Sequence, residues 1–506
     1  MAKSVRTATT ARTVRSRRRA AGNGSNRSVR AGRRPRITAA GQLPGGGTLL
    51  LVNMIPRSLS DETNQDSEPT LAVNPRNNNQ IVGTAFTPDP LGGNMAPVFI
   101  SSDGGTTWSL NSIVPSETET ADICVGFGRS GHLYAGILKL PAPFEDTRLN
   151  IVRTSDAQST APMRVLVDRL GVDQPYVQTT PSVNAASRDR VYVGDNDFRT
   201  DAQTSTIDFS LNARVANARF KKAQIDARPN TMQNGPQVRP ACHSSGRVYL
   251  AFMRWTAQHG SWTANTLVVT ADLVVVRDDN GGSGPSPFTS LVDPSDLKPG
   301  VRVARSITFP FHHDENGVPG QQRLGGDVAI AVDPTNRDVV YVAFASLEQS
   351  GYTVHVRRST DAGLTWSGDL RRLPGATNPS LAVNSQRKVG LLYQQLTGTS
   401  ALRWVTHFDR SSDGGTGWTS FVLADTPANQ PVADFSPYLG DYDCVLSVGK
   451  DFYGIFSANN APDNSHFPNG VVYQRNADFA TRRLLGLDNS TTVRVSIDPF
   501  FFKVTE

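Results

Sequence analysis

The chain is poor in the features that mark several protein classes. Its three cysteines, Cys124, Cys242 and Cys444, are too few and too widely spaced for a disulfide framework or a metal-ligand cluster. No apolar run is long enough to cross a bilayer. Gly-x-Ser-x-Gly elbows, His-Glu-x-x-His pairs and phosphate-binding loops are missing as well. We therefore expect no transmembrane helix, no metal and no cofactor.

Acidic residues are missing from the first 60 positions, whereas residues 1–45 contain one Lys and eleven Arg. Without these twelve charges, the whole-chain total of 51 basic residues falls to 39 against 45 acidic ones, a net charge of −6. The segment is rich in Ser, Ala, Gly and Thr and has no apolar periodicity, which is typical of disorder. The sequence thus predicts a disordered basic tail, 1–45, and a folded body, 46–506. Clustered Arg side chains suit an anionic polymer, and a solvated tail without a partner is the alternative.

A secretory signal is also not visible, because no apolar stretch of roughly 7–15 residues follows the basic start. The short run Thr48–Val52 is better interpreted as the first β-strand of the body. The sequence leaves the compartment and the oligomeric state open.

One eight-residue pattern, Ser-x-Asp-x-Gly-x-x-Trp, occurs three times. Its copies begin at Ser101, Ser359 and Ser411, and each follows a short run of strand-forming residues. An Asp carboxylate in a tight hairpin can accept hydrogen bonds from backbone N–H groups two or three residues further on. Gly supplies the positive φ, and the Trp packs the returning strand against the sheet. The repeat therefore predicts three equivalent turns between strands.

The pattern resembles the Asp-box, or BNR repeat, of the sialidase superfamily, whose members are β-propellers. The resemblance implies an all-β propeller fold in which the boxes lie on the outer rim, between the third and fourth strands of a blade. It gives a structural role to six residues, Asp103, Trp108, Asp361, Trp366, Asp413 and Trp418. A degenerate copy at Thr154–Asp156 lacks both the Gly and the Trp.

The body repeats a module of about four short strands. Clear openings are Glu68–Pro75, Asp327–Pro334 and Asn378–Asn384, and weaker ones lie near Asp122, Asp173, Gln237 and Tyr438. Seven modules of this size predict a seven-bladed β-propeller, with six blades, as in sialidases, as the alternative. A long insertion, about 278–322, interrupts the fourth module, and the run Thr492–Ile497 is expected to complete a blade with the strand at 48–55.

Acidic residues recur where the modules open, at Glu68, Asp122, Asp173 and Asp327, with Asp441 in the last module. The innermost strands of a propeller line its central channel, so these side chains are expected to ring one mouth of that channel. Such a ring can bind sugar hydroxyls or a cation, or pair with arginines. The alternative is that each acid caps its own blade entry through hydrogen bonds to the backbone.

The sialidase resemblance implies a mechanism in which three arginines bind the substrate carboxylate. A Tyr, activated by a Glu, is the nucleophile, and an Asp is the acid/base catalyst. The family's Phe/Tyr-Arg-Ile-Pro motif is missing here. Substitutes are proposed from position alone. The predicted catalytic residues are Tyr442, Asp441, Asp197 and Glu68, and the predicted substrate-binding residues are Arg199, Arg239 and Arg254.

Two functions follow from this interpretation. The first is a sialidase-like, glycan-directed propeller, with exo-glycosidase activity at the channel mouth and a glycan or glycoconjugate as its partner. The second is a non-catalytic propeller that binds a carbohydrate or a protein. The acids and arginines at the blade entries favour the first function, and the missing arginine motif favours the second. The family resemblance leans toward an extracellular location.

Overall fold

The computed structural model describes residues 41–506, except 87–89, 92–94, 117, 141–145, 184, 200–203, 232–237, 262–263, 265, 312–326, 350 and 435–437. The chain divides into two compact units, Met1–Ala39 and Ala40–Glu506, and the fold below is that of the second. Residues 1–40 of the predicted basic tail lie outside the described residues, as does the predicted insertion from residue 312 onward.

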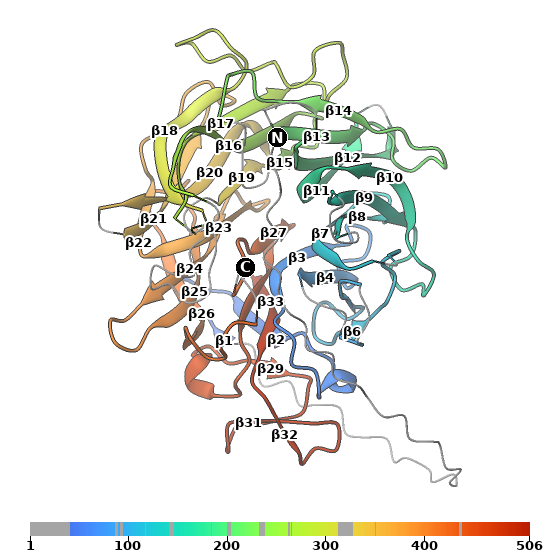
Figure 1. The fold of residues 1–506 in the computed structure, drawn as a ribbon, viewed down its shortest axis with the longest axis vertical. Coiled ribbons are helices and arrows are strands. Elements are labelled where there is room, and N and C mark those ends of the chain that lie inside the picture. Colours follow the sequence, from blue (N-terminus) through green and yellow to red (C-terminus); the bar gives the residue numbers. More distant parts are fainter. Residues whose placement is uncertain are drawn as a thin grey trace. The chain divides into compact units, whose positions relative to one another are not determined.

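Six sheets each hold four consecutive strands in antiparallel order, so the chain completes one sheet before it begins the next (Figure 1). Their bounds are β3 Ser67–Val73, β4 Ile81–Phe86, β5 Val98–Ser101 and β6 Ser109–Leu110; β7 Thr120–Phe127, β8 Leu133–Lys139, β9 Arg148–Thr154 and β10 Arg164–Leu170; β11 Val172–Ser182, β12 Ala185–Asp197, β13 Ser205–Ser210 and β14 Lys221–Gln224; β15 Arg239–Cys242, β16 Val248–His259, β17 Val268–Asp278 and β18 Val301–Pro310; β19 Val328–Asp333, β20 Asn336–Glu348, β21 Gly351–Ser359 and β22 Arg371–Pro374; β23 Ala376–Val383, β24 Val389–Thr397, β25 Arg403–Ser411 and β26 Thr419–Pro427.

A further sheet joins the two ends of the body. It contains β27 Cys444–Val448, β28 Asp451–Asn459, β33 Ile497–Thr505 and β2 Thr48–Asn53, with β1 Gly41–Gln42 and β29 Val472–Tyr473 at its margin. The expected pairing of the N-terminal strand with the end of the chain is found, since Leu51 lies opposite Phe502. That last strand begins at Ile497, five residues later than expected, because the buried run Phe500–Phe502 belongs to it.

Three short strands between β29 and β33 form a small separate sheet. Its strands are β30 Ala477–Asp478, β31 Arg483–Leu485 and β32 Thr492–Val493. The two helical turns among the described residues are the short 3-10 segments η1 Arg57–Leu59 and η2 Asn464–His466. In the described part of the chain, no helix has the length and hydropathy needed to cross a membrane.

The first strands of the sheets follow one another around a centre (Figure 1). Each contacts the first strand of the next sheet, in the order β3, β7, β11, β15, β19, β23 and β27, and β27 contacts β3 again. Apolar clusters fill the spaces between successive sheets, such as one that joins Val82 and Ile100 to Ile123 and Leu133. This all-β arrangement of four-stranded antiparallel sheets is consistent with a β-propeller.

The three repeated turns lie between the third and fourth strands of their sheets and share one set of hydrogen bonds. In the second copy, Ser359 Oγ donates to Asp361 at 2.7 Å, and the N–H of Thr365 donates to the same carboxylate at 2.9 Å. Trp366 Nε1 donates to the carbonyl of Gly363 at 3.1 Å. The copies at 101–108 and 411–418 repeat these contacts. These contacts fit the structural role expected for the Asp and Trp residues.

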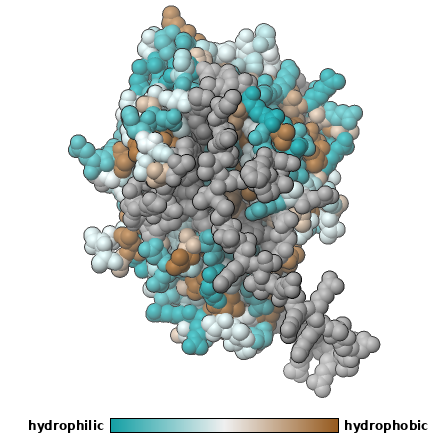
Figure 2. All heavy atoms as spheres, in the orientation of Figure 1, coloured by the Kyte–Doolittle hydropathy of each residue, from teal (hydrophilic) through white to brown (hydrophobic). Residues whose placement is uncertain are grey.

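Hydrophilic residues dominate the coloured surface in Figure 2, with hydrophobic residues scattered among them. The large exposed hydrophobic side chains of the described residues come from many different segments, for example Val165, Leu297 and Val432. Single exposed apolar residues of this kind are normal for a folded protein.

Candidate functional site

Polar side chains from six of the seven large sheets meet where their first strands begin. We call this set the central cluster. It comprises Glu68, Asp122, Tyr176, Arg239, Asp327, Asp441, Tyr442 and Asp443. All of them except Tyr176 are 2–7% exposed. Charged side chains that are buried to this extent require partners, because an isolated ion loses its hydration inside a protein.

A recurring bulge sets the starting points of the first strands. Glu68, Gln174 and Asn378 each precede a proline and adopt a positive φ of 51–55°. At each of these places the first strand has one residue more than its partner, as between Ser67 and Thr70. A bulge re-aims the neighbouring side chains. The polar residue–Pro pair at each bulge is a signal that can be seen in the sequence.

Arg239 is the only cation of the central cluster. Its guanidinium carbon lies 4.1 Å from the ring centre of Tyr176 and 5.0 Å from that of Tyr442. It pairs with Asp327 at 3.0 Å and donates to the carbonyl of Val328 at 3.0 Å. Stacking between two aromatic faces together with a carboxylate partner stabilises a buried guanidinium. The contacts of Arg239 are therefore with residues inside the fold.

The predicted nucleophile Tyr442 donates its hydroxyl hydrogen to Asp122 Oδ1 at 3.2 Å. Burial, together with the negative charges of Asp122 and Glu68, raises the pKa of Tyr442 well above its usual value. The phenol consequently stays protonated in this environment, whereas a nucleophile needs an activated oxygen. The contact holds the Asp122 carboxylate in place.

Two other predicted catalytic residues, Glu68 and Asp441, also lie together. The backbone N–H of Asp441 donates to Glu68 Oε1 at 3.1 Å. Between them Gly440 has a φ of +119°, and a Cβ there would lie 2.4 Å from the backbone nitrogen of Glu68. Only glycine allows this close approach of the last module to the first.

Asp443 is buried, and neither of its carboxyl oxygens accepts a hydrogen bond of normal geometry from the described residues. Burial and the charge of Asp327 raise its pKa well above the usual value, although the backbone N–H of Ser457 acts in the opposite direction. Asp443 lines a cavity of about 20 Å³ together with Tyr176 and Arg239. That volume is enough for about one water molecule. Burial at the centre of the fold therefore favours the protonated form of this carboxyl group.

The remaining predicted residues lie elsewhere. Arg199 is 56% exposed at its side chain and pairs with Asp146. Asp197 is buried and pairs with Arg169 at 2.9 Å and with Lys222 at 2.7 Å. Hence Asp197 and Arg199 belong to contacts around the second and third modules, away from the partners of Arg239.

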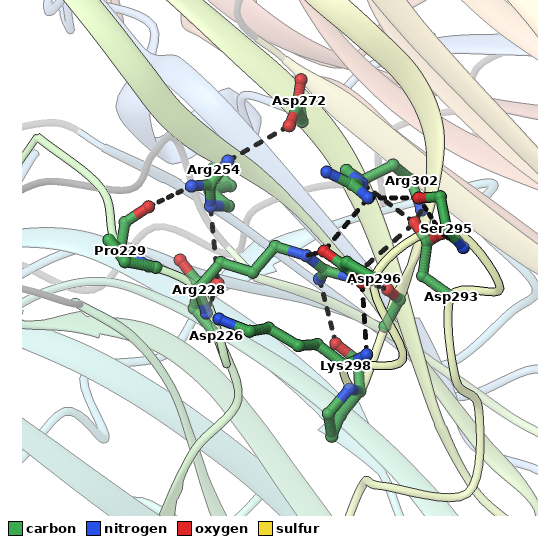
Figure 3. Close-up of polar contacts among 12 residues, drawn as sticks. Asp226, Arg228, Pro229, Arg254, Asp272, Asp293, Ser295, Asp296, Lys298 and Arg302 are labelled. Atoms are coloured by element: carbon green, nitrogen blue, oxygen red, sulfur yellow. Dashed lines mark hydrogen bonds and ion pairs between the residues drawn. The ribbon is translucent and has the colours of Figure 1, made fainter.

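Arg254 lies in a third place, a network of charged side chains (Figure 3). It contacts Asp272 at 3.1 Å and the carbonyl of Pro229. Beside it, buried Arg228 pairs with Asp296 at 2.8 Å and donates to the carbonyl of Gly300 at 2.8 Å. The network holds residues 279–300, which connect β17 to β18. The predicted insertion, about 278–322, therefore includes the strand β18. The three predicted arginines therefore pair with three different aspartates.

One group of carboxylates has the spacing of a cation site. Oxygen atoms of Glu62, Asp66 and Asp498 lie within 4.8 Å of one another, and all three residues are buried. Arg475, fully buried, pairs with Asp498 at 2.8 Å and lies 3.8 Å from Glu62. Burial and the Asp498 charge raise the pKa of Glu62 to about 8, against the opposing effect of Arg475. Arg475 and a proton bound to Glu62 neutralise much of the negative charge of these three carboxyl groups.

No protein-family model matches the chain, and no curated protein matches it either. Similar solved structures include a protein of unknown function from Dyadobacter fermentans, with a TM-score of 0.42 and 10% identity over 90% of this chain and 98% of that one. An alpha-L-arabinofuranosidase from Fusarium graminearum gives a TM-score of 0.40 and 11% identity over 76% of this chain and 98% of that one. A polysaccharide lyase of family PL25, an ulvan lyase, gives a TM-score of 0.45 and 9% identity over 78% of this chain and 92% of that one.

Two of these three proteins are glycan-acting enzymes of kinds other than sialidase. Their identities to this chain are 9% and 11%, and their TM-scores are 0.45 and 0.40. A likeness at this level carries no activity from one protein to another. The function of this chain has to be argued from its own residues.

Proposed function

We propose that the protein is a seven-bladed β-propeller that hydrolyses a neutral glycan at the central cluster. The observation that carries the proposal is Asp443, a buried carboxyl group without a normal hydrogen bond and with a raised pKa. A buried polar group left unpaired destabilises the folded protein by about 1–3 kcal/mol, so its presence calls for a reason other than folding. Strongly perturbed carboxyl groups are concentrated in catalytic sites.

The charge of the central cluster favours a neutral sugar over a sialoside. Five carboxyl side chains lie there with one arginine, and that arginine already pairs with Asp327. A substrate carboxylate would meet negative charge without a free guanidinium to bind it. Arg199 and Arg254, the other arginines expected to bind it, pair with their own aspartates. The same acids can accept hydrogen bonds from sugar hydroxyls.

Glycoside hydrolysis requires one carboxylic acid that gives a proton and one carboxylate that acts as base or nucleophile. In this proposal Asp443 is the acid, because burial and the charge of Asp327 raise its pKa and so favour the protonated form. The neighbouring carboxylate of Asp327, paired with Arg239, is the second group. Tyr442, Glu68 and Asp441 act as positioning residues through the hydrogen bonds that they make within the cluster.

A second candidate is a propeller that binds a glycan or a protein without catalysis. The small size of the cavity beside Asp443 favours it, since about 20 Å³ holds far less than a sugar ring. In this case the central cluster joins the blades at their inner ends, and the ligand binds at another surface.

Fluorogenic glycosides distinguish the two candidates. The panel contains several neutral glycosides and one sialoside, tested with the full chain and with the isosteric variant Asp443→Asn. We expect turnover of a neutral glycoside and a fall of about 100-fold or more in kcat for Asp443→Asn, because an amide cannot supply the proton. Arg199→Ala serves as the control and should retain activity. Turnover of the sialoside alone, or no turnover of any glycoside, would overturn the proposal.

A further inference from the structure

A second group of functional side chains lies away from the central cluster, in the sheet β19–β22. Ser346 Oγ is 3.0 Å from His355 Nε2, and His355 Nδ1 is 2.8 Å from Asp369 Oδ2. Ser346 and His355 are 7% and 6% exposed. The order of these atoms is that of a Ser-His-Asp triad, with the acid on one imidazole nitrogen and the hydroxyl on the other.

The strand register explains why these side chains meet. Phe344 and Ser346 are two residues apart on β20, so they lie on one face of the sheet. His355 on β21 lies opposite Phe344 and therefore shares that face. The Phe344 and His355 rings stack at 4.9 Å with an interplanar angle of 16°. This stacking fixes the plane of the imidazole.

The acid of the triad is held as a carboxylate. Arg357 Nε donates to Asp369 Oδ1 at 2.8 Å, while His355 occupies the other oxygen. Burial would raise the pKa of Asp369, but the hydrogen bonds from His355 and Arg357 lower it to about 2. An ionised Asp369 keeps the imidazole hydrogen on Nδ1, which leaves Nε2 free to accept the hydroxyl hydrogen of Ser346.

The triad opens onto a pocket of about 260 Å³ between β18 and the strands β20 and β21. Its lining includes Ser346, His355, Glu348 and the guanidinium-bearing residues Arg305 and Arg357. The volume is close to the lower end of ligand pockets, about 300–1,000 Å³. Arg357 donates to Asp369 and to the carbonyl of Val303, and Arg305 donates to Ser295, so the rim of the pocket carries positive charge.

We propose that Ser346, His355 and Asp369 form an acyl-transfer site that hydrolyses small carboxylic esters. Ser346 Oγ adds to the ester carbonyl while its proton passes to His355 Nε2. The bond to the alcohol oxygen breaks, and the alcohol leaves with that proton. Water then adds to the acyl-serine, gives its proton to His355, and releases the carboxylic acid as Ser346 regains its hydrogen. Asp369 is the positioning residue of this site.

Glu348 competes for the same imidazole nitrogen. Its Oε1 lies 3.3 Å from His355 Nε2, and its Oε2 pairs with Arg372. A protonated imidazole would bridge Glu348 and Asp369 instead of accepting from Ser346. Glu348→Gln removes the negative charge beside Nε2, so it weakens this competing contact and is expected to raise ester hydrolysis.

The test uses the full chain with p-nitrophenyl acetate and a fluorophosphonate probe that labels activated serines. We expect the probe to modify Ser346, as located by mass spectrometry, and Ser346→Ala to lower ester hydrolysis at least about 100-fold. Asp369→Asn should lower it as well and displace the pH profile, which a merely structural contact would not do. Ser245→Ala is the matched control, because Ser245 also contacts a histidine, His243 Nδ1 at 2.9 Å.

Labelling of a serine other than Ser346, or no labelling of the wild-type protein, would overturn the proposal. Labelling of the wild type decides the matter even if Ser346→Ala does not fold. The site is independent of the central cluster, so loss of esterase activity in Ser346→Ala with unchanged glycoside turnover would separate the two sites.

Discussion

Replacing Arg475 with methionine should destabilise the sheet that joins the two ends of the body. Arg475 is fully buried and contacts Asp498 through two bonds of 2.8 and 3.1 Å. It also donates to the backbone carbonyls of Ser60 and Glu62 at 3.1 and 2.6 Å. These contacts hold the segment after β2 against the segment before β33. Methionine fills a similar space but carries no charge and no donor.

The expected loss of stability depends on the partners that remain around Asp498 after the substitution. Removing one partner of a buried ion pair destabilises a protein by about 3–5 kcal/mol, because the other charge stays buried. Asp498 keeps donors from Asn53 at 2.7 Å and from Asn460 at 2.6 Å. We therefore expect a loss near the lower end, about 3 kcal/mol in the free energy of unfolding.

Urea unfolding at pH 7, followed by tryptophan fluorescence, measures this loss. Arg494→Met is the matched control, because Arg494 pairs with Asp434 at 3.2 Å with both side chains about half exposed. An exposed pair of this kind contributes about 0.2–1 kcal/mol. If Arg475→Met lost no more stability than Arg494→Met, the asparagines alone would hold Asp498, and the argument from the buried pair would be wrong.

Two further predictions concern stability. The pKa of Glu62 is raised from 4.5 to about 8, so the folded state binds more protons than the unfolded state between these values, and stability falls as pH rises through that range. Glu62→Gln should flatten this slope in urea unfolding, and an unchanged slope would contradict the shift. Asp361→Ala loses its bonds from Ser359 and Thr365 and should lower stability by about 1–2 kcal/mol. Asp156 in the degenerate turn accepts a hydrogen bond from the N–H of Gln158. Asp156→Ala should therefore lower the free energy of unfolding by less than Asp361→Ala does.

The place of a residue within its repeated module was enough to predict part of the central cluster. Glu68, Arg239 and Tyr442 lie at the starts of first strands or just before them, and the structure brings them together. Arg199 and Arg254 follow or lie within second strands, β12 and β16. A second strand lies about 4.8 Å farther from the centre than the first. Its arginines reach other acids instead, Asp146 before β9 and Asp272 on β17.

Side-chain partners across modules could not be predicted from the sequence. Asp443 follows Tyr442 in an ordinary acidic segment, and only the folded chain shows that it is buried beside Tyr176 and Arg239 and near the charge of Asp327. The same holds for Ser346, His355 and Asp369, whose spacing matches no motif. Their approach depends on the register of β20 against β21 and on the path of the loop before β22.

The sequence by itself determined the all-β class, the repeated module and the three turns that begin at Ser101, Ser359 and Ser411. These features depend on local chemistry, since glycine conformations, turn hydrogen bonds and alternating apolar residues act over a few residues. The tertiary structure alone decided which charges pair, which carboxyl groups have a raised pKa, and which residues face a pocket. Those properties depend on distances between residues far apart in the chain and on the water that packing excludes.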